Sequence, residues 1–184
     1  MTRRILIAVD GSDHSHRAVA FYADNMNKSS DVLIFTYAIE PPALPRGTGA
    51  SLMANSEVYA NMMKDAMKAG SQIGKAVRER CRQLGVSNET KFVERVTNNP
   101  GQSIVEVAKE ENVSIIIMGN RGMGTLRRTF LGSVSDYVLH HAHRPVLIIP
   151  PEKPASRKSS VDNRKSSADA RKASTDKKPT GAGV

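Results

Sequence analysis

The sequence predicts an α/β fold with a five-stranded parallel sheet and helices on both faces. Short apolar runs alternate along the chain with longer segments whose apolar residues recur at helical spacing. This alternation is typical of strand–helix–strand units with right-handed crossovers, which build parallel sheets. The first run, Ile5–Val9, is apolar throughout, as expected for a strand that is covered on both faces. Spacing alone leaves the order of the strands open.

The first half of the chain is expected to form two strands and two helices. Asp10-Gly11-Ser12 ends the first strand, and Ser12 or Asp13 can cap the helix that follows. Val32–Ile39 is the second expected strand. A polar loop from Glu40 to about Asn55 precedes a long helix that closes near Leu84-Gly85. The first helix has one apolar stripe, which consists of Val19, Tyr22, Ala23 and Met26.

The second half continues the alternation. A third strand is expected at Thr90–Val96, and a turn at Thr97–Gly101 leads into a short amphipathic helix. The fourth and fifth strands are expected at Val113–Met118 and Pro145–Ile149. A helix at Ser133–His143 lies between them.

The composition is that of one mid-sized domain with an appendage. The chain has 184 residues, of which 39% are hydrophobic. No run of about 18 or more apolar residues is present, so no transmembrane helix is expected. The first apolar run is too short for a secretory signal peptide. The single cysteine, Cys81, excludes an internal disulfide and agrees with a reducing compartment. We therefore expect a cytoplasmic protein without membrane contact.

Residues 152–184 differ in composition from the rest of the chain. They hold nine Lys or Arg against four Asp or Glu, and almost no large apolar residue. Such a segment cannot bury enough surface to offset its ordering entropy. The sequence thus predicts a domain over residues 1–151 and a disordered basic tail that can bind an acidic protein partner. Nucleic-acid binding is not expected, because aromatic residues make up only 4% of the chain and Trp is absent.

The tail also repeats every seven residues. Ser160, Ser167 and Ser174 each follow an Arg by three positions and a Lys by two, a pattern that basophilic kinases accept. Each phosphate adds about −1.5 to −2 charge. Three phosphates would neutralise the tail or make it slightly negative, which would release an acidic partner. A solvated basic tail without modification is the alternative.

A glycine-bearing segment between the fourth expected strand and the next helix carries the main functional signal. It reads Gly119-Asn120-Arg121-Gly122, then nine residues, then Gly132-Ser133. Glycines let the backbone approach an anion closely, and the first amides of a helix point at it. The segment is neither a Walker loop, since Leu131 precedes Gly132, nor G-x-G-x-x-G, since Arg127 takes the third glycine position. One glycine alone would indicate a turn with positive φ, but the joint spacing favours phosphate contact.

The pattern G-x2-G-x9-G-S resembles the nucleotide-binding signature of the universal stress protein family. The likeness covers about the first 150 residues and includes the opening Ile5–Ser12 and the closing Arg144–Pro150. It implies a flavodoxin-like or Rossmann-like sheet in the order 3-2-1-4-5, with a ligand at the carboxyl ends of strands 1 and 4. It also implies a homodimer paired through the last strand, Val146–Ile149, whose apolar edge invites pairing.

Carried over position by position, the resemblance implies an adenine-nucleotide site. The expected nucleotide-binding residues are Ala8, Val9, Asp10, Ala38, Met118, Gly119, Arg121, Gly122, Gly132, Ser133, Val134 and Ser135. The apolar members would line the adenine slot or simply belong to the core, and the Gly132-Ser133 end would hold the terminal phosphates. Asp10 would hold the ribose hydroxyls or a phosphate-bound Mg²⁺, although an acid at this position can also cap a helix. His14 and His16 open the first helix near this site; either could contact a phosphate, but a solvated face is favoured.

These observations predict an ATP-binding stress-response regulator with little or no turnover. Nucleotide hydrolysis needs a placed water, an orienting base or Gln, and a cation, and the motif supplies only Asp10. A regulatory protein is therefore favoured over an enzyme. Two alternatives stay open. One is a weak Mg²⁺-dependent ATPase or phosphotransferase that uses Asp10, and the other is a dimeric scaffold or adaptor that acts through its basic tail.

Overall fold

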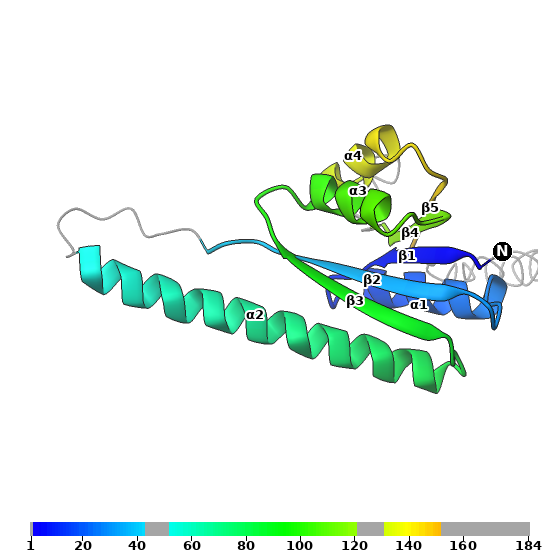
Figure 1. Cartoon of the computed structure of the whole chain (residues 1–184), viewed down its shortest axis with the longest axis horizontal. Helices are drawn as coiled ribbons and strands as arrows, with labels where there is room; N and C mark the ends of the chain where they lie inside the picture. Colours follow the sequence, from blue (N-terminus) through cyan, green and yellow to red (C-terminus); the bar gives the residue numbers. More distant parts are fainter. Residues whose placement is uncertain (1, 43–51, 121–130, 152–184) are drawn as a thin grey trace, which may run out of the picture. The chain divides into compact units, whose positions relative to one another are not determined.

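A computed structural model describes residues 2–42, 52–120 and 131–151 of the chain, and for residues 52–55 the backbone. The described residues form one five-stranded parallel sheet in the order β3-β2-β1-β4-β5, flanked by helices (Figure 1). The predicted fold class and strand order are confirmed. The elements in chain order are β1 (Arg4–Ala8), α1 (Asp13–Asn25), β2 (Val32–Ile39), α2 (Leu52–Gln83), β3 (Glu89–Val96), α3 (Pro100–Glu110), β4 (Ile115–Gly119), α4 (Ser133–His141) and β5 (Val146–Ile149).

All of these elements belong to one unit, Met1–Pro151. A second unit, Glu152–Val184, lies outside the described residues, together with Ser160, Ser167 and Ser174. The disorder of the tail and its phosphorylation therefore stay predictions. Within the described ranges, none of the helices has the combined length and apolarity that crossing a bilayer requires.

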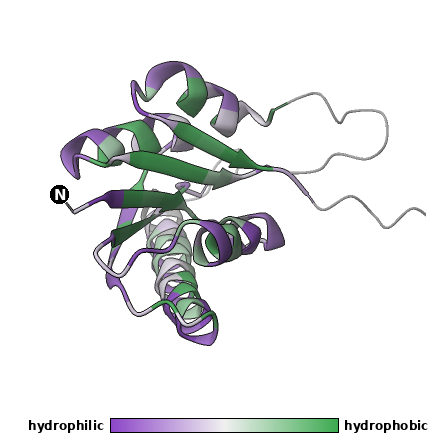
Figure 2. Cartoon of the chain, turned by 90° about the vertical axis from the view of Figure 1, so that its right-hand side faces the viewer, coloured by the Kyte–Doolittle hydropathy of each residue, from purple (hydrophilic) through white to green (hydrophobic). Residues whose placement is uncertain are grey.

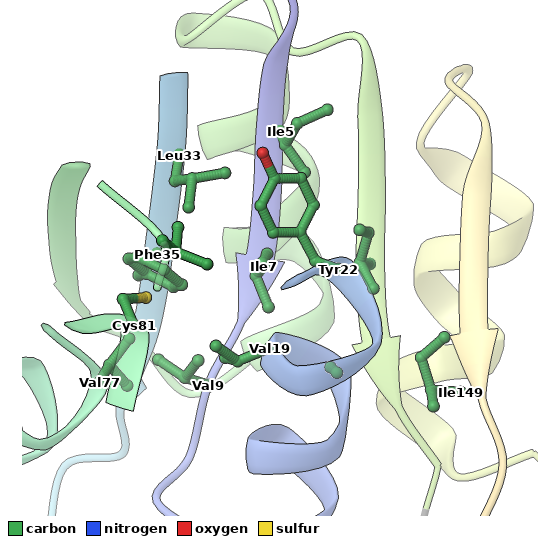
Figure 3. Packing of buried hydrophobic residues seen from close by; sticks show 13 residues of the cluster. Ile5, Ile7, Val9, Val19, Tyr22, Leu33, Phe35, Val77, Cys81 and Ile149 are labelled. Carbon is green, nitrogen blue, oxygen red and sulfur yellow. The ribbon is translucent and has the colours of Figure 1, made fainter. Parts of the chain in front are cut away.

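The sheet is covered by α1 and α2 on one face and by α3 and α4 on the other (Figure 1). Because side chains alternate along a strand, β1 contributes to both layers. Ile5 and Ile7 pack with Val19 and Tyr22 of α1 (Figure 3), whereas Leu6 packs with residues of α3 and α4. Figure 2 shows the inner strands as largely hydrophobic and the helices with hydrophilic outer faces, whereas the edge strand β3 carries charged residues. This two-sided burial explains the unbroken apolar run in the sequence.

Parallel pairing brings the carboxyl ends of β1, β2 and β4 to the same edge of the sheet. β1 pairs with β2 so that Ala8 lies opposite Thr36, and with β4 so that Ile7 lies opposite Ile117. Beyond the end of β1, the N–H of Val9 still donates to the Thr36 carbonyl at 2.9 Å. The chain leaves this edge in opposite directions from β1 and β4, and open α/β sheets form their ligand crevice at such a point.

Two predicted boundaries after α3 are wrong by two residues. The helix predicted to end at His143 ends at His141, because His143 has a φ of 46° and cannot continue a right-handed helix. The fourth strand begins at Ile115 instead of Val113, after a turn in which Asn112 has a φ of 45°. Both shifts arise from left-handed residues other than glycine, which sequence patterns do not reveal.

The long helix α2 begins earlier than predicted. Its first residue is Leu52, inside the segment predicted as loop, because the apolar periodicity that indicates a helix starts only at Val58. Its second half packs on the sheet through Val77 and Cys81 (Figure 3). In its first half, Val58 is 48% exposed and Met67 is 55% exposed. The packed half of α2 thus covers β2 and β3, and the first half does not pack on the sheet in the same way.

At the amino ends of the strands, a buried carboxylate joins β1, α1 and the start of β2. The side chain of Asp31 is 0% exposed. Arg3 donates to both of its oxygens, from Nε at 2.8 Å and from Nη2 at 2.6 Å, and the Tyr22 hydroxyl donates at 2.8 Å. Burial disfavours the charged carboxylate, but the hydrogen bonds from Arg3 and Tyr22 outweigh burial, so the pKa of Asp31 is lowered.

Candidate functional site

A pocket of about 360 Å³ opens at the edge of the sheet where β1, β2 and β4 end. Residues of α3 and the amino terminus of α4 complete its wall. The volume lies within the range of roughly 300–1,000 Å³ that small-molecule sites occupy. The pocket therefore lies where the strand order reverses, as ligand sites of open α/β sheets do.

Ten of the twelve residues predicted for a nucleotide site line this one pocket. They come from four separate parts of the sequence: Ala8, Val9, Asp10, Ala38, Met118, Gly119, Gly132, Ser133, Val134 and Ser135. The other two, Arg121 and Gly122, lie outside the described residues. The structure thus brings the described members of the predicted set together. Their contact with a nucleotide stays a prediction.

The strand ends supply the apolar part of the lining. Val9 is 5% exposed and Met118 is 4% exposed, while Ala8 and Ala38 are half-buried. Val9 packs in the core cluster on the α1 and α2 side, and Met118 packs in the cluster on the α3 and α4 side. Val9 and Met118 are therefore core residues that also face the pocket, which makes this part of the lining rigid.

The amino terminus of α4 presents uncapped backbone amides. Gly132 is the N-cap residue, and no side chain of the described residues caps the helix. The first amide that donates within α4 is that of Asp136, to the Gly132 carbonyl at 2.9 Å. The amides of Ser133, Val134 and Ser135 precede it and have no acceptor inside the helix. All three residues line the pocket, so these N–H groups and the positive end of the helix dipole can stabilise an anion there.

Gly119 and Gly132 differ in what surrounds them. A Cβ on Gly119 would lie 2.0 Å from the backbone carbonyl oxygen of His14, so the approach of α1 to the end of β4 requires a glycine. Gly132 has an ordinary φ of −67°, and a Cβ there would meet nothing within 4 Å. Among the described glycines only Gly11 and Gly85 have a positive φ. The alternative that these glycines are needed for turns with positive φ is therefore wrong for both Gly119 and Gly132. The described fold also does not require a glycine at the start of α4.

Asp10 shapes the turn between β1 and α1. Its Oδ1 accepts from the Ser12 backbone N–H at 3.0 Å and from the Ser12 hydroxyl at 2.5 Å. Ser12 in turn caps α1 by accepting from the Ser15 N–H at 3.4 Å. Of the two predicted caps, Ser12 is confirmed, and Asp13 is the first residue of the helix. Asp10 itself is exposed and lines the pocket, so its carboxylate both orders the helix start and borders the site.

Eight further residues line the pocket, and of these the sequence points only to His14, near the site at the start of the first helix, and to Asn120, within the glycine-bearing segment. The eight residues are His14, Ser15, Thr36, Tyr37, Glu40, Pro100, Ile104 and Asn120. Thr36, Tyr37 and Glu40 flank Ala38, and their position at the end of a central parallel strand is a signal that could have identified them. His14, expected on a solvated face, is half-buried in the lining instead, because the first turn of α1 rests against the end of β4.

Negative charge gathers near the end of β2. Burial raises the pKa of Tyr37, and the charges of Asp10, Glu40 and Glu94 raise it further. The motif supplies one carboxylate, Asp10, and the fold adds Glu40 to the same lining. Within the described residues, however, no group of three or more His, Cys, Asp or Glu could hold a metal ion.

Positive charge lies near the end of β4. Arg17 of α1 bonds through Nη2 to Nδ1 of His14 at 2.9 Å and to the Asn120 carbonyl at 3.0 Å. His14 and Asn120 both line the pocket. Two polar atoms of this group, Arg17 Nε and Asn120 Oδ1, are buried and have no hydrogen-bond partner in the described part of the chain. The two ends of the pocket thus differ in charge.

Comparisons with known proteins were made with the whole chain. The family model described as "Universal stress protein family" matches residues 1–150. Universal stress protein MJ0531 of Methanocaldococcus jannaschii is 33% identical over 147 residues, which cover 80% of this chain and 81% of that protein.

Two solved structures show the same fold. A universal stress protein family protein from Arabidopsis thaliana, with AMP bound, has a TM-score of 0.59 and 17% identity, and the match covers 84% of this chain and 97% of that one. A universal stress protein in complex with cAMP has a TM-score of 0.53 and 24% identity, and the match covers 80% and 95%.

Proposed function

The chain belongs to the universal stress protein family, and from this premise we propose that it binds ATP in the pocket at the ends of β1, β2 and β4. In this proposal it is a stress-response regulator with little or no turnover. Two structural neighbours carry AMP and cAMP, which supports adenine as the base. The observation that carries the proposal is the start of α4, where uncapped amides border the pocket beside a glycine that the described fold does not require.

The phosphates would lie against the amides of Ser133, Val134 and Ser135. The open space at Gly132 lets an anion approach the backbone closely. Ser133 is exposed, so its hydroxyl can donate as well. Arg121 and Gly122, outside the described residues, belong to the same loop and are proposed to contact the phosphates too.

The adenine would occupy the apolar part of the lining, formed by Ala8, Val9, Ala38 and Met118. A helix amino terminus contributes about 0.3–1 kcal/mol with a nearby charge and up to ~2 kcal/mol when partly buried. Micromolar affinity requires about 8 kcal/mol. The amides of α4 therefore cannot supply the affinity alone, and burial of the base must supply much of the rest. Adenosine without phosphates should consequently still bind, although more weakly.

Low turnover is proposed because the site offers few groups for hydrolysis. Asp10 is engaged by Ser12, and the described residues contain no metal-binding group of three. The alternative, a weak Mg²⁺-dependent ATPase or phosphotransferase, is favoured by Glu40, the second carboxylate in the lining. Multiple-turnover phosphate release that disappears in both Asp10→Asn and Glu40→Gln supports the alternative. No release above the buffer rate, with ATP bound, supports the regulator.

Pairing of two copies through β5 is part of the same proposal. β5 is an edge strand, and its first three residues, Val146, Leu147 and Ile148, are only half-buried within one chain. An apolar edge of this kind pairs readily with another strand. Light scattering on the purified chain should give the mass of a dimer, and a monomer mass at every concentration would contradict this part of the proposal.

The basic tail, residues 152–184, is proposed to bind an acidic protein partner in the cytoplasm and to release it when Ser160, Ser167 and Ser174 are phosphorylated. The charge of the tail and the kinase-type spacing support this role. Salt-sensitive binding that is lost on deleting the tail and is indifferent to ATP would favour the scaffold or adaptor alternative. Tail serines that remain unmodified under all conditions in the native source contradict the switch.

The nucleotide proposal is tested on the full chain by mass spectrometry of the retained ligand and by calorimetric titration with ATP. Wild type should retain ATP, and Gly132→Val, which fills the space beside the first amides of α4, should lose it. His140→Gln, an exposed change near the other end of the same helix, is the matched control and should bind as wild type does. Equal unfolding temperatures of the variants exclude misfolding. Wild type that neither retains nor binds ATP at millimolar concentration contradicts the proposal.

A further inference from the structure

Arg17 links the first turn of α1 to the end of β4. Its Nη2 bonds to Nδ1 of His14 at 2.9 Å and to the Asn120 carbonyl at 3.0 Å. These two partners come from α1 and from the residue after β4, and both line the pocket. The guanidinium of Arg17, which does not itself line the pocket, therefore holds two lining residues, His14 and Asn120, in place.

The contact with Arg17 fixes the tautomer of His14. A guanidinium carries only N–H donors and no acceptor. In the hydrogen bond between Arg17 and His14, Nδ1 must therefore accept, and the ring proton of neutral His14 must reside on Nε2. His14 thus presents one hydrogen-bond donor, Nε2–H, from a half-buried position in the lining.

His14 lies on the β4 side of the pocket. Its backbone carbonyl lies against Gly119, the first glycine of the G-x2-G-x9-G-S loop, and the base slot at Ala38 lies at the end of β2, on the other side of β1. The guanidinium of Arg17 adds positive charge on this side, which favours an anion. Arg17 Nε and Asn120 Oδ1 are buried without partners in the described residues. A polar cluster of this kind beside a pocket indicates a group that meets a ligand.

Resting on the proposed function, we propose that His14 donates a hydrogen bond from Nε2 to a phosphate oxygen of the bound nucleotide. Arg17 is its positioning residue, which holds the ring in the donor tautomer. His14 then helps the site to distinguish a phosphorylated nucleotide from a nucleoside. It acts in addition to the amides of α4.

The test compares AMP with adenosine, which differ only in the phosphate, by calorimetric titration of the full chain. His14→Ala should weaken AMP binding roughly tenfold, the usual effect of losing one charge-assisted hydrogen bond, and should leave adenosine binding within about twofold. His14→Gln retains an N–H donor near the position of Nε2 and should restore most of the AMP affinity. His16→Ala, on the same turn of α1 but outside the lining, should match wild type.

The role of Arg17 is tested without ligand by ¹⁵N NMR of the imidazole nitrogens of His14. Wild type should show the Nε2–H tautomer. Arg17→Met keeps the aliphatic stem but removes the donor, and it should give a mixture of tautomers and part of the AMP-specific loss. A change in stability alone would not alter the tautomer, so this readout separates positioning from a structural role.

Three outcomes overturn the inference. If His14→Ala weakens AMP and adenosine equally, or weakens neither, His14 makes no phosphate contact, while the proposed nucleotide function stands. If the wild-type ring carries its proton on Nδ1, the positioning role of Arg17 is wrong. If wild type binds neither AMP nor adenosine, this inference fails, and the proposed function fails with it only when ATP does not bind either.

Discussion

The carbonyl oxygen of His14 lies so close to Gly119 that a Cβ on the glycine would come within 2.0 Å of it. The first turn of α1 therefore rests directly on the backbone at the end of β4. This contact closes one side of the pocket, because both residues belong to its lining. A glycine of a binding motif can thus be required by the fold before any ligand is considered.

Gly119→Ala should destabilise the fold, whereas Gly132→Ala should not. At Gly119 the backbone of α1 must shift to admit a Cβ, and overpacking of this kind costs about 1–3 kcal/mol. At Gly132 a Cβ meets nothing within 4 Å. Thermal unfolding monitored by circular dichroism measures both variants. Equal unfolding temperatures for the two variants would contradict the contrast.

Tyr22→Phe should lower the free energy of unfolding by about 2 kcal/mol, because it removes a hydrogen bond to a charged, buried carboxylate. The ring keeps its packing in the core (Figure 3), and the variant loses the hydroxyl that donates to Asp31 at 2.8 Å and contacts Asn27 Oδ1 at 3.3 Å. Urea unfolding gives the value. Tyr137→Phe, which keeps its ring stacked on His141, is the matched control and should change the stability by less. A Tyr22→Phe variant as stable as wild type would show that this bond contributes nothing.

The stability gained from Asp31 should depend on pH in one direction. Its folded-state pKa is lowered, so its contribution is present above the unfolded value of about 3.9 and is lost as pH falls through the folded value. Asp31→Asn should therefore cost about 2–3 kcal/mol near neutral pH, where Arg3 loses a largely buried partner. The difference in the free energy of unfolding between wild type and Asp31→Asn should become smaller below about pH 4.

Urea unfolding at several pH values follows this gap. Glu79→Gln, which removes an exposed ion pair with Arg82, serves as the control and should show no comparable loss at neutral pH. A gap between wild type and Asp31→Asn that stays constant down to acidic pH would show that the Asp31 charge does not contribute.

Cys81 should be unreactive in the folded protein. Its side chain is packed between α2 and the sheet at 2% exposure, and burial raises the pKa of the thiol to about 11. The reactive form of a cysteine is the thiolate, so a thiol reagent near pH 8 should label the native chain slowly and the urea-unfolded chain at once. Rapid stoichiometric labelling without denaturant would contradict this packing.

The fold could be predicted because the burial of strands and helices determines the spacing of apolar residues along the sequence. The continuous run at Ile5–Val9 reflects a strand between two layers, and the stripe that includes Val19 and Tyr22 reflects a helix with one covered face. The strand order could not be deduced from periodicity and came from the resemblance. The early start of α2 at Leu52 was missed, because the first apolar position at helical spacing is Val58.

The candidate site was predictable where a motif or the family resemblance pointed to its residues. The glycine motif identified both ends of the loop between β4 and α4, and the resemblance implied the apolar positions at the strand ends. Arg17 was missed because its bond to the Asn120 carbonyl depends on how α1 docks on β4, across 103 residues of sequence, and without that bond its closeness to His14 on the same helix carries no signal. The structural requirement for a glycine at position 119 could not be predicted either, because the residue it contacts, His14, is distant in the chain.

The buried Asp31 cluster and the pocket occupy opposite edges of one sheet, and β2 runs from the first to the second. The Asp31 cluster thus stabilises the domain far from the pocket, whereas Val9, Met118 and Gly119 belong both to the packing of the fold and to the pocket lining. Substitutions in the pocket lining can change which ligand binds, while the Asp31 cluster at the opposite edge of the sheet keeps the domain folded. Descendants of one ancestral chain could in this way diverge in their ligands without first having to solve the packing of their interior again.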